Sequence, residues 1–183
     1  MGRMTVAQAL RAVRRERRGE TAIEFAMIAP IFFLVLFATA EIAAFSLLQT
    51  NMDLAAADAS RRIRTGEVQR DGITAGQLKQ DVCDDLRRWM PVDCDTRLLI
   101  DVDRSNRFGG LAGGSPLVGG NLDTGQIGYQ PGDQNDIVLV RLYYRWEVYT
   151  PFFKMLFGNM ATGERLLASA LMFRNEPFGD PNA

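Results

Sequence analysis

Few residues in this sequence are of a type that could carry catalytic or metal-binding chemistry. The chain of 183 residues has 22 carboxylates and two cysteines but no histidine. Without histidine, serine–histidine and cysteine–histidine catalysis and most zinc sites are excluded. No nucleophilic side chain has an evident base beside it that could activate it. We therefore expect that the protein is not an enzyme and uses no cofactor.

The one covalent cross-link that the composition permits is a disulfide between Cys83 and Cys94. Such a bond forms in oxidising compartments, and so it requires that this part of the chain is exported. It would close a loop of about a dozen residues and stabilise the fold by roughly 3 kcal/mol in the chain-entropy model. Two free, buried thiols are the alternative. We expect the disulfide.

The acidic residues occur in close pairs that could suggest a cation site. Asp101-x-Asp103-x-Ser105 begins like a calcium loop, but the twelfth position is Ala112, where a bidentate glutamate is needed. The glycine-rich stretch 109–132 is not a phosphate-binding loop, because no Gly-Lys-Ser/Thr follows it. We predict no metal site, a solvated acidic surface, and a long loop over 109–132.

The charge of the chain is divided unevenly. Residues 1–19 contain six arginines and one glutamate, a net charge of +5, and the remaining 164 residues carry −6. A basic segment directly before an apolar run sets membrane orientation, with the arginines in the cytoplasm. The basic residues have no aromatic residues among them, which disfavours a nucleic-acid surface. We predict that residues 1–19 are a basic cytoplasmic leader.

The apolar run that follows the leader has three interpretations. Residues 25–40 contain no charge, and after Glu41 the apolar character continues to Leu48. The run could be a signal peptide cut after Ala40, an uncleaved single-pass anchor, or an anchor whose leader is removed after Gly19. Sixteen residues cover about 24 Å, and extension to Leu48 covers about 36 Å, enough to span a hydrocarbon core of about 30 Å.

Cleavage after Gly19 is the interpretation with the clearest physical role for individual residues. A peptidase acting at the cytoplasmic face needs an extended, small residue at the cut, and glycine has that freedom. The cut exposes a new amine on Glu20 and leaves the anchor intact. A carboxylate at the apolar edge of a membrane is costly unless paired, and Glu24 could pair with the amine of a neighbouring subunit. Snorkelling of Glu24 toward water is the alternative.

The helix that begins in the membrane is predicted to continue well beyond it. Small or apolar residues recur at three- and four-residue steps, at Met52, Ala55, Ala56, Ala59 and Ile63. We expect one helix over 20–65, with arginines in its last turn and Gly66 as its stop. The alanines would let other helices approach closely, and Pro30 predicts a kink or a locally broken turn, as an aid to packing or merely tolerated.

The N-terminal pattern as a whole resembles a known family. Residues 15–26, with Pro30 and the apolar run, are similar to the TadE-like family of minor pseudopilins from tight-adherence (Flp-type) pilus systems, and residues 51–61 resemble its helical continuation. The resemblance implies cleavage after Gly19 by a prepilin peptidase. It also implies other pilins and pseudopilins, and an inner-membrane assembly platform, as partners. TadF-like and TadG-like proteins share the N-terminal pattern; a TadG-type von Willebrand domain does not fit in this length.

The remaining sequence predicts a small domain. A helix is expected over 77–90, with Thr74 as N-cap and Pro91 as stop, and strands over 97–103 and 137–149. Residues 151–157 read as an apolar turn or short helix that packs on the core, docks on the long helix, or meets the membrane or a partner. Residues 164–174 could be a strand or a short helix, and the TadE-like resemblance favours a strand.

Together these features predict an α+β protein: a long N-terminal transmembrane helix, then one further helix and an antiparallel sheet of about three strands. The expected divisions are a leader at 1–19, a membrane helix with its extension at 20–65, and a periplasmic domain at 66–183. We expect a minor pseudopilin of the inner membrane that takes part in pilus assembly. The alternative is an exported binding or structural protein with an ordinary signal peptide.

Overall fold

The computed structural model describes residues 18–107 and 116–178, so the predicted basic leader lies almost entirely outside the described residues. Part of the predicted loop over 109–132 and the end of the C-terminal tail lie outside them as well. The chain divides into two compact units, residues 1–40 and 41–183, which are described separately.

The long helix predicted from the sequence is present as α2 (Arg18–Arg64, 47 residues). Its last turn contains three arginines, and Gly66 follows it with φ of 75°, a left-handed conformation that glycine adopts without strain. Pro30 lies inside the helix, and the helix continues without a break on both sides of this proline. A locally broken turn at this proline, one of the two outcomes predicted, is therefore not observed.

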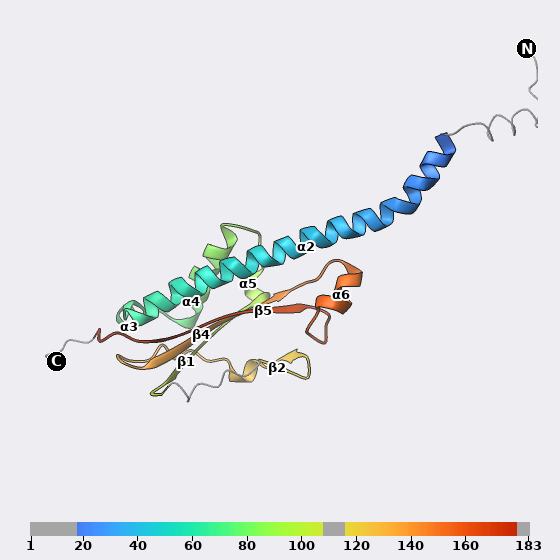
Figure 1. The fold of residues 1–183 in the computed structure, drawn as a ribbon. Coiled ribbons are helices and arrows are strands. Elements are labelled where there is room, and N and C mark those ends of the chain that lie inside the picture. Colours follow the sequence, from blue (N-terminus) through green and yellow to red (C-terminus); the bar gives the residue numbers. More distant parts are fainter. Residues whose placement is uncertain (1–17, 108–115, 179–183) are drawn as a thin grey trace, which may run out of the picture. The chain divides into compact units, whose positions relative to one another are not determined.

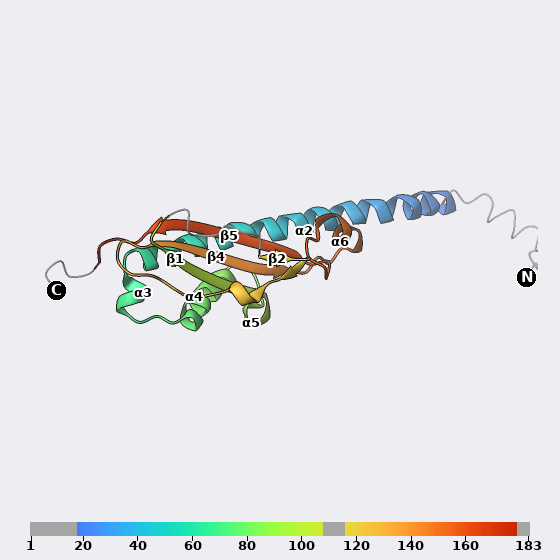
Figure 2. The same cartoon turned by 90° about the horizontal axis from the view of Figure 1, so that it is seen from below.

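The second unit contains a three-stranded antiparallel sheet in the order β1-β4-β5. Its strands are β1 (Leu98–Ser105), β4 (Ile137–Trp146) and β5 (Arg165–Arg174). The three strands predicted from sequence are confirmed, and the segment 164–174 is a strand rather than a helix. Figures 1 and 2 show that the part of α2 in this unit, residues 41–64, lies along one face of this sheet together with α4.

Helix α4 (Ala75–Arg87) is the further helix expected from the sequence. Thr74 is its N-cap: the Thr74 hydroxyl accepts from the N–H of Gln77, and the Gln77 side chain accepts from the N–H of Thr74. The helix ends three residues before the predicted boundary. Trp89 lies beyond its end and is exposed.

Short elements complete the unit. Three are single helical turns: α3 (Glu67–Arg70), α5 (Cys94–Arg97) and the 3-10 turn η2 (Thr124–Gln126). α6 (Pro151–Phe157) is the predicted short apolar helix. The predicted long loop contains a small hairpin of β2 (Leu117–Val118) and β3 (Asn121–Leu122), which sequence reasoning missed. Gly119 and Gly120 both have positive φ, as a tight two-residue hairpin turn requires.

One hydrophobic core joins the helices to the sheet. The inward side of β4 supplies Val138, Val140, Leu142 and Tyr144, and α4 supplies Leu78, Val82, Cys83 and Leu86. From α2 come Leu48, Met52, Ala55, Ala56, Ala59 and Ile63. The C-terminal part of α2 is therefore a structural element of the second unit, because its apolar stripe is buried in that unit's core.

Candidate functional site

The residues predicted to take part in processing lie in the first turns of α2. Gly19, Glu20 and Glu24 are all exposed on this helix. Gly19 is helical in this structure, whereas a peptidase needs an extended residue at the bond that it cuts. A side chain added at Gly19 would meet nothing within 4 Å, so packing does not explain the glycine. Glycine weakens a helix by about 1 kcal/mol relative to alanine, which makes this turn easier to unwind.

The uncharged run that follows is apolar on every side of the helix. Its large side chains are exposed at Phe25, Met27, Ile28, Ile31, Phe32, Phe33, Leu34, Val35, Leu36 and Phe37. A helix of a soluble domain normally has one apolar face and one polar face, whereas a helix that is apolar all round suits a lipid environment. In the described part of the chain this is the one helix long and apolar enough to cross a membrane, by length and composition.

The alanine stripe of α2 lies inside its own domain. Ala55, Ala56 and Ala59, predicted to allow close helix packing, are buried in the core that α2 forms with α4 and the sheet. Ala56 is completely buried, with an exposed fraction of 0%. The small side chains let α2 lie close to the sheet of the same chain.

Glu41, which interrupts the apolar run in the sequence, has a defined structural role. Its carboxylate accepts hydrogen bonds from the N–H groups of Tyr149 (2.6 Å) and Thr150 (3.1 Å). These two residues connect β4 to α6, and Thr150 is the N-cap of α6. Farther along α2, the ring of Phe45 lies 6.4 Å from that of Phe157, between centroids. Glu41 and Phe45 thus fix α6 to α2.

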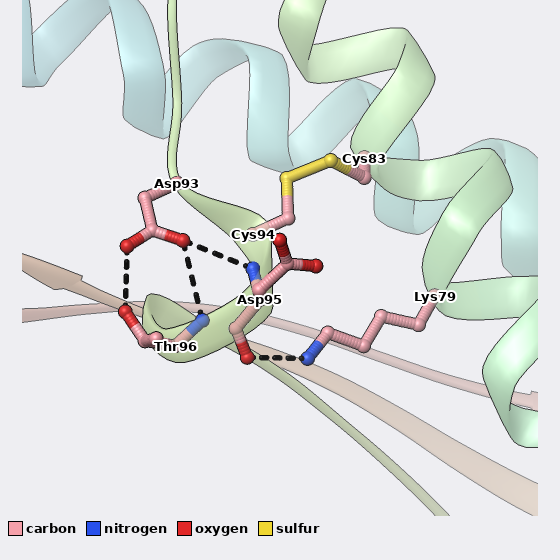
Figure 3. The surroundings of a disulfide bond; sticks show 6 residues. All are labelled: Lys79, Cys83, Asp93, Cys94, Asp95 and Thr96. Atoms are coloured by element: carbon pink, nitrogen blue, oxygen red, sulfur yellow. Dashed lines mark hydrogen bonds between the residues drawn. A yellow bond between two sulfur atoms is a disulfide. The ribbon is translucent and has the colours of Figure 1, made fainter.

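The predicted disulfide between Cys83 and Cys94 is present in the structure. Figure 3 shows that it joins α4 to the turn α5, which leads directly into β1. Beside it, the Asp93 carboxylate accepts from the Thr96 hydroxyl at 2.6 Å and from the N–H groups of Asp95 and Thr96. The hydrogen bond from the Thr96 hydroxyl, followed by that from its N–H, lowers the pKa of Asp93 below its ordinary value.

The sequence predicted a solvated acidic surface, but Asp101 is buried and Asp103 is only partly exposed. Both lie in β1, and the guanidinium group of Arg141 on β4 donates to Asp101 at 2.7 Å and to Asp103 at 2.8 Å. Asp101 is 2% exposed and also accepts from the N–H of Gly128 at 2.9 Å. A strand that uses its carboxylates in this way is not a calcium loop. Among residues 18–107 and 116–178, no cluster of three or more histidine, cysteine or acidic side chains could hold a metal ion.

The sequence contained only part of the information needed to find these contacts. Arg141 and Asp101 face each other in the register of β1 and β4, and strand pairing was the signal that could have joined them. Glu41 and Tyr149 are 108 positions apart. No periodicity or motif connects two residues at that separation, so this attachment could not have been found from the sequence.

The described chain combines an apolar helix that is a candidate membrane span, an exposed glycine and exposed glutamates in the first turns of that helix, and a small α+β domain. Residues 19–61 match the family model described as TadE-like protein. The resemblance predicted from the sequence is confirmed over this segment, and the match supports a part in a tight-adherence pilus system. No curated protein and no solved structure matches the chain.

Proposed function

We propose that the protein is a minor pseudopilin that takes part in the assembly or initiation of a tight-adherence pilus. The observation that carries this proposal is the TadE-like match over residues 19–61, which begins at the glycine of the proposed cleavage site. The apolar part of α2 anchors the chain in the inner membrane. The arginines before it stay in the cytoplasm, and the domain lies in the periplasm, where its disulfide is stable.

Processing by a prepilin peptidase after Gly19 is the first step of the proposed mechanism. The helical turn at Gly19 has to unwind so that the peptide bond can enter the peptidase, and the glycine lowers the cost of that unwinding. Cleavage leaves a free amine on Glu20. The exposed Glu24 carboxylate then pairs with the amine of a neighbouring pilin or pseudopilin when the apolar helices assemble.

The proposed role is not enzymatic: the protein is a substrate of the peptidase and a partner of other pilins and of the inner-membrane assembly platform. Its lateral contacts with other pilins use the apolar part of α2 that precedes Glu41, because the alanine stripe of the later part is buried in the domain. Whether Pro30 aids this packing is a separate prediction, tested by Pro30→Ala in a piliation assay.

The intact mass of the mature protein tests the processing step directly. The expected mature chain begins at Glu20. A Gly19→Trp variant should accumulate as the uncut precursor, whereas Glu24→Gln should be cut normally but assemble fewer pili. Normal processing of Gly19→Trp would refute the peptidase assignment. Full piliation with Glu24→Gln would show that Glu24 does not act in assembly and only extends toward water.

A second candidate function is an exported structural or binding protein released by ordinary signal cleavage. The sequence Ala38-Thr39-Ala40 favours it, because it has the A-x-A pattern of a signal-cleavage site and stands directly before the second compact unit. The same mass measurement separates the two candidates. A mature chain that begins at Glu41 would refute the pseudopilin proposal, because it has lost the membrane helix.

A further inference from the structure

Helix α6 is held in one place on the second unit by contacts to the first residues of that unit. The Glu41 carboxylate binds the two N–H groups that lead into α6. The Phe45 ring lies against Phe157, and the guanidinium group of Arg165 lies 5.6 Å from the centroid of the same Phe45 ring. Figures 1 and 2 both show α6 beside α2. Its position along α2 is therefore the level of residues 41–45.

The side of α6 that does not contact α2 is apolar and exposed. Met155 is 78% exposed and Leu156 is 57% exposed, and Tyr149, just before the helix, is 70% exposed. Lys154 is exposed among them. Single exposed apolar residues are common on soluble proteins. Three large ones within eight positions, next to a lysine, form a surface that suits a membrane interface better than water.

The length of the apolar run places this surface relative to a bilayer. Residues 25–40 cover about 24 Å as a helix, and a hydrocarbon core is about 30 Å thick. The next four residues, 41–44, supply the remaining distance of about 6 Å. Glu41 and Phe45, which hold α6, directly follow the uncharged run in the chain, so α6 is tethered within a few residues of the outer end of the span. Tyrosine and lysine are favoured side chains at such a membrane interface.

We propose that Tyr149, Met155 and Leu156 form a lipid-binding foot that rests on the outer surface of the inner membrane, with Lys154 directed to the lipid phosphates. The inference rests on the proposed membrane anchor. It also explains how a carboxylate can be placed at this level: the charge of Glu41 is met by two backbone N–H groups. The foot would hold the domain close to the membrane before the subunit enters an assembly.

Spin labels on the full chain test this proposal. Met155→Cys, Asp71→Cys and Leu36→Cys are labelled without reductant, so that the native disulfide stays closed, and reconstituted in vesicles of phosphatidylcholine with phosphatidylglycerol. Collisions of each label with oxygen and with a water-soluble nickel chelate are then measured. Asp71 is an exposed control in the turn after α3, and Leu36 reports insertion of the span.

The expected result is a several-fold lower nickel accessibility, with higher oxygen accessibility, at position 155 than at position 71. Equal accessibilities at positions 155 and 71, with position 36 deep in lipid, would overturn the foot and leave the anchor intact. Exclusion of both reagents at position 155 would also overturn it, because that result means burial against protein. A water-exposed label at position 36 would refute the anchor, and the foot with it.

Discussion

The contact between Glu41 and the start of α6 allows a prediction about local stability. Replacing Glu41 by alanine removes the acceptor of the N–H groups of Tyr149 and Thr150, at 2.6 and 3.1 Å. A hydrogen bond to a charged group contributes roughly 1.5–3 kcal/mol. Because the bond from Tyr149 is exposed to solvent, we expect that Glu41→Ala lowers the stability of the α6 attachment by about 2 kcal/mol, less than the sum of two full hydrogen bonds.

The assay is amide hydrogen exchange on the full chain in detergent micelles. A loss of about 2 kcal/mol corresponds to roughly thirtyfold faster exchange of the two amides, with a smaller change in the sheet, because α6 opens locally before the core unfolds. Glu41→Gln keeps one acceptor oxygen and should fall between the wild type and Glu41→Ala.

Asp58→Ala provides a matched control on the same helix. Asp58 forms a surface ion pair with Arg61 at 3.1 Å, and such exposed pairs contribute about 0–1 kcal/mol. This variant should leave the exchange of Tyr149 and Thr150 unchanged. If Glu41→Ala also left it unchanged, the attachment of α6 through Glu41 would be disproved.

Three further predictions concern the domain. The double change Cys83→Ala and Cys94→Ala should lower the free energy of unfolding by about 3 kcal/mol, because the bond closes a short loop; an unchanged urea midpoint would contradict this. Ala56→Leu should destabilise the domain by about 1–3 kcal/mol through overpacking, whereas Ala57→Leu, on the exposed side, should not; equal melting temperatures for the two variants would show that α2 does not pack as described. Asp93 has a lowered pKa, so its contribution to the stability of the folded domain is present above its ordinary pKa of 3.8 and is lost as the pH falls through its pKa in the folded state. In Asp93→Asn, this part of the acid-induced destabilisation should be missing from denaturation curves measured against pH.

The local patterns of the sequence predicted most of the secondary structure. The apolar run, the spacing of the alanines and the arginine-rich last turn predicted α2 almost to its ends. Thr74 predicted the start of α4, because an N-cap acts on residues only two or three positions away, and the structure adds a capping box with Gln77. The hairpin of β2 and β3 was missed, since strands of two residues are too short to show an alternating pattern.

The sequence by itself determined that the chain has a glycine and a glutamate before an apolar run, a TadE-like segment, and a small α+β domain. It could not determine what each face of that helix packs against. The tertiary structure assigned the alanine stripe to the domain's own core, Glu41 to α6, and Asp101 to Arg141. The physical reason is separation along the chain. Local patterns show that a helix face is apolar or that an acid is present, but the residues that Asp101 and Glu41 bind lie 40 and 108 positions away.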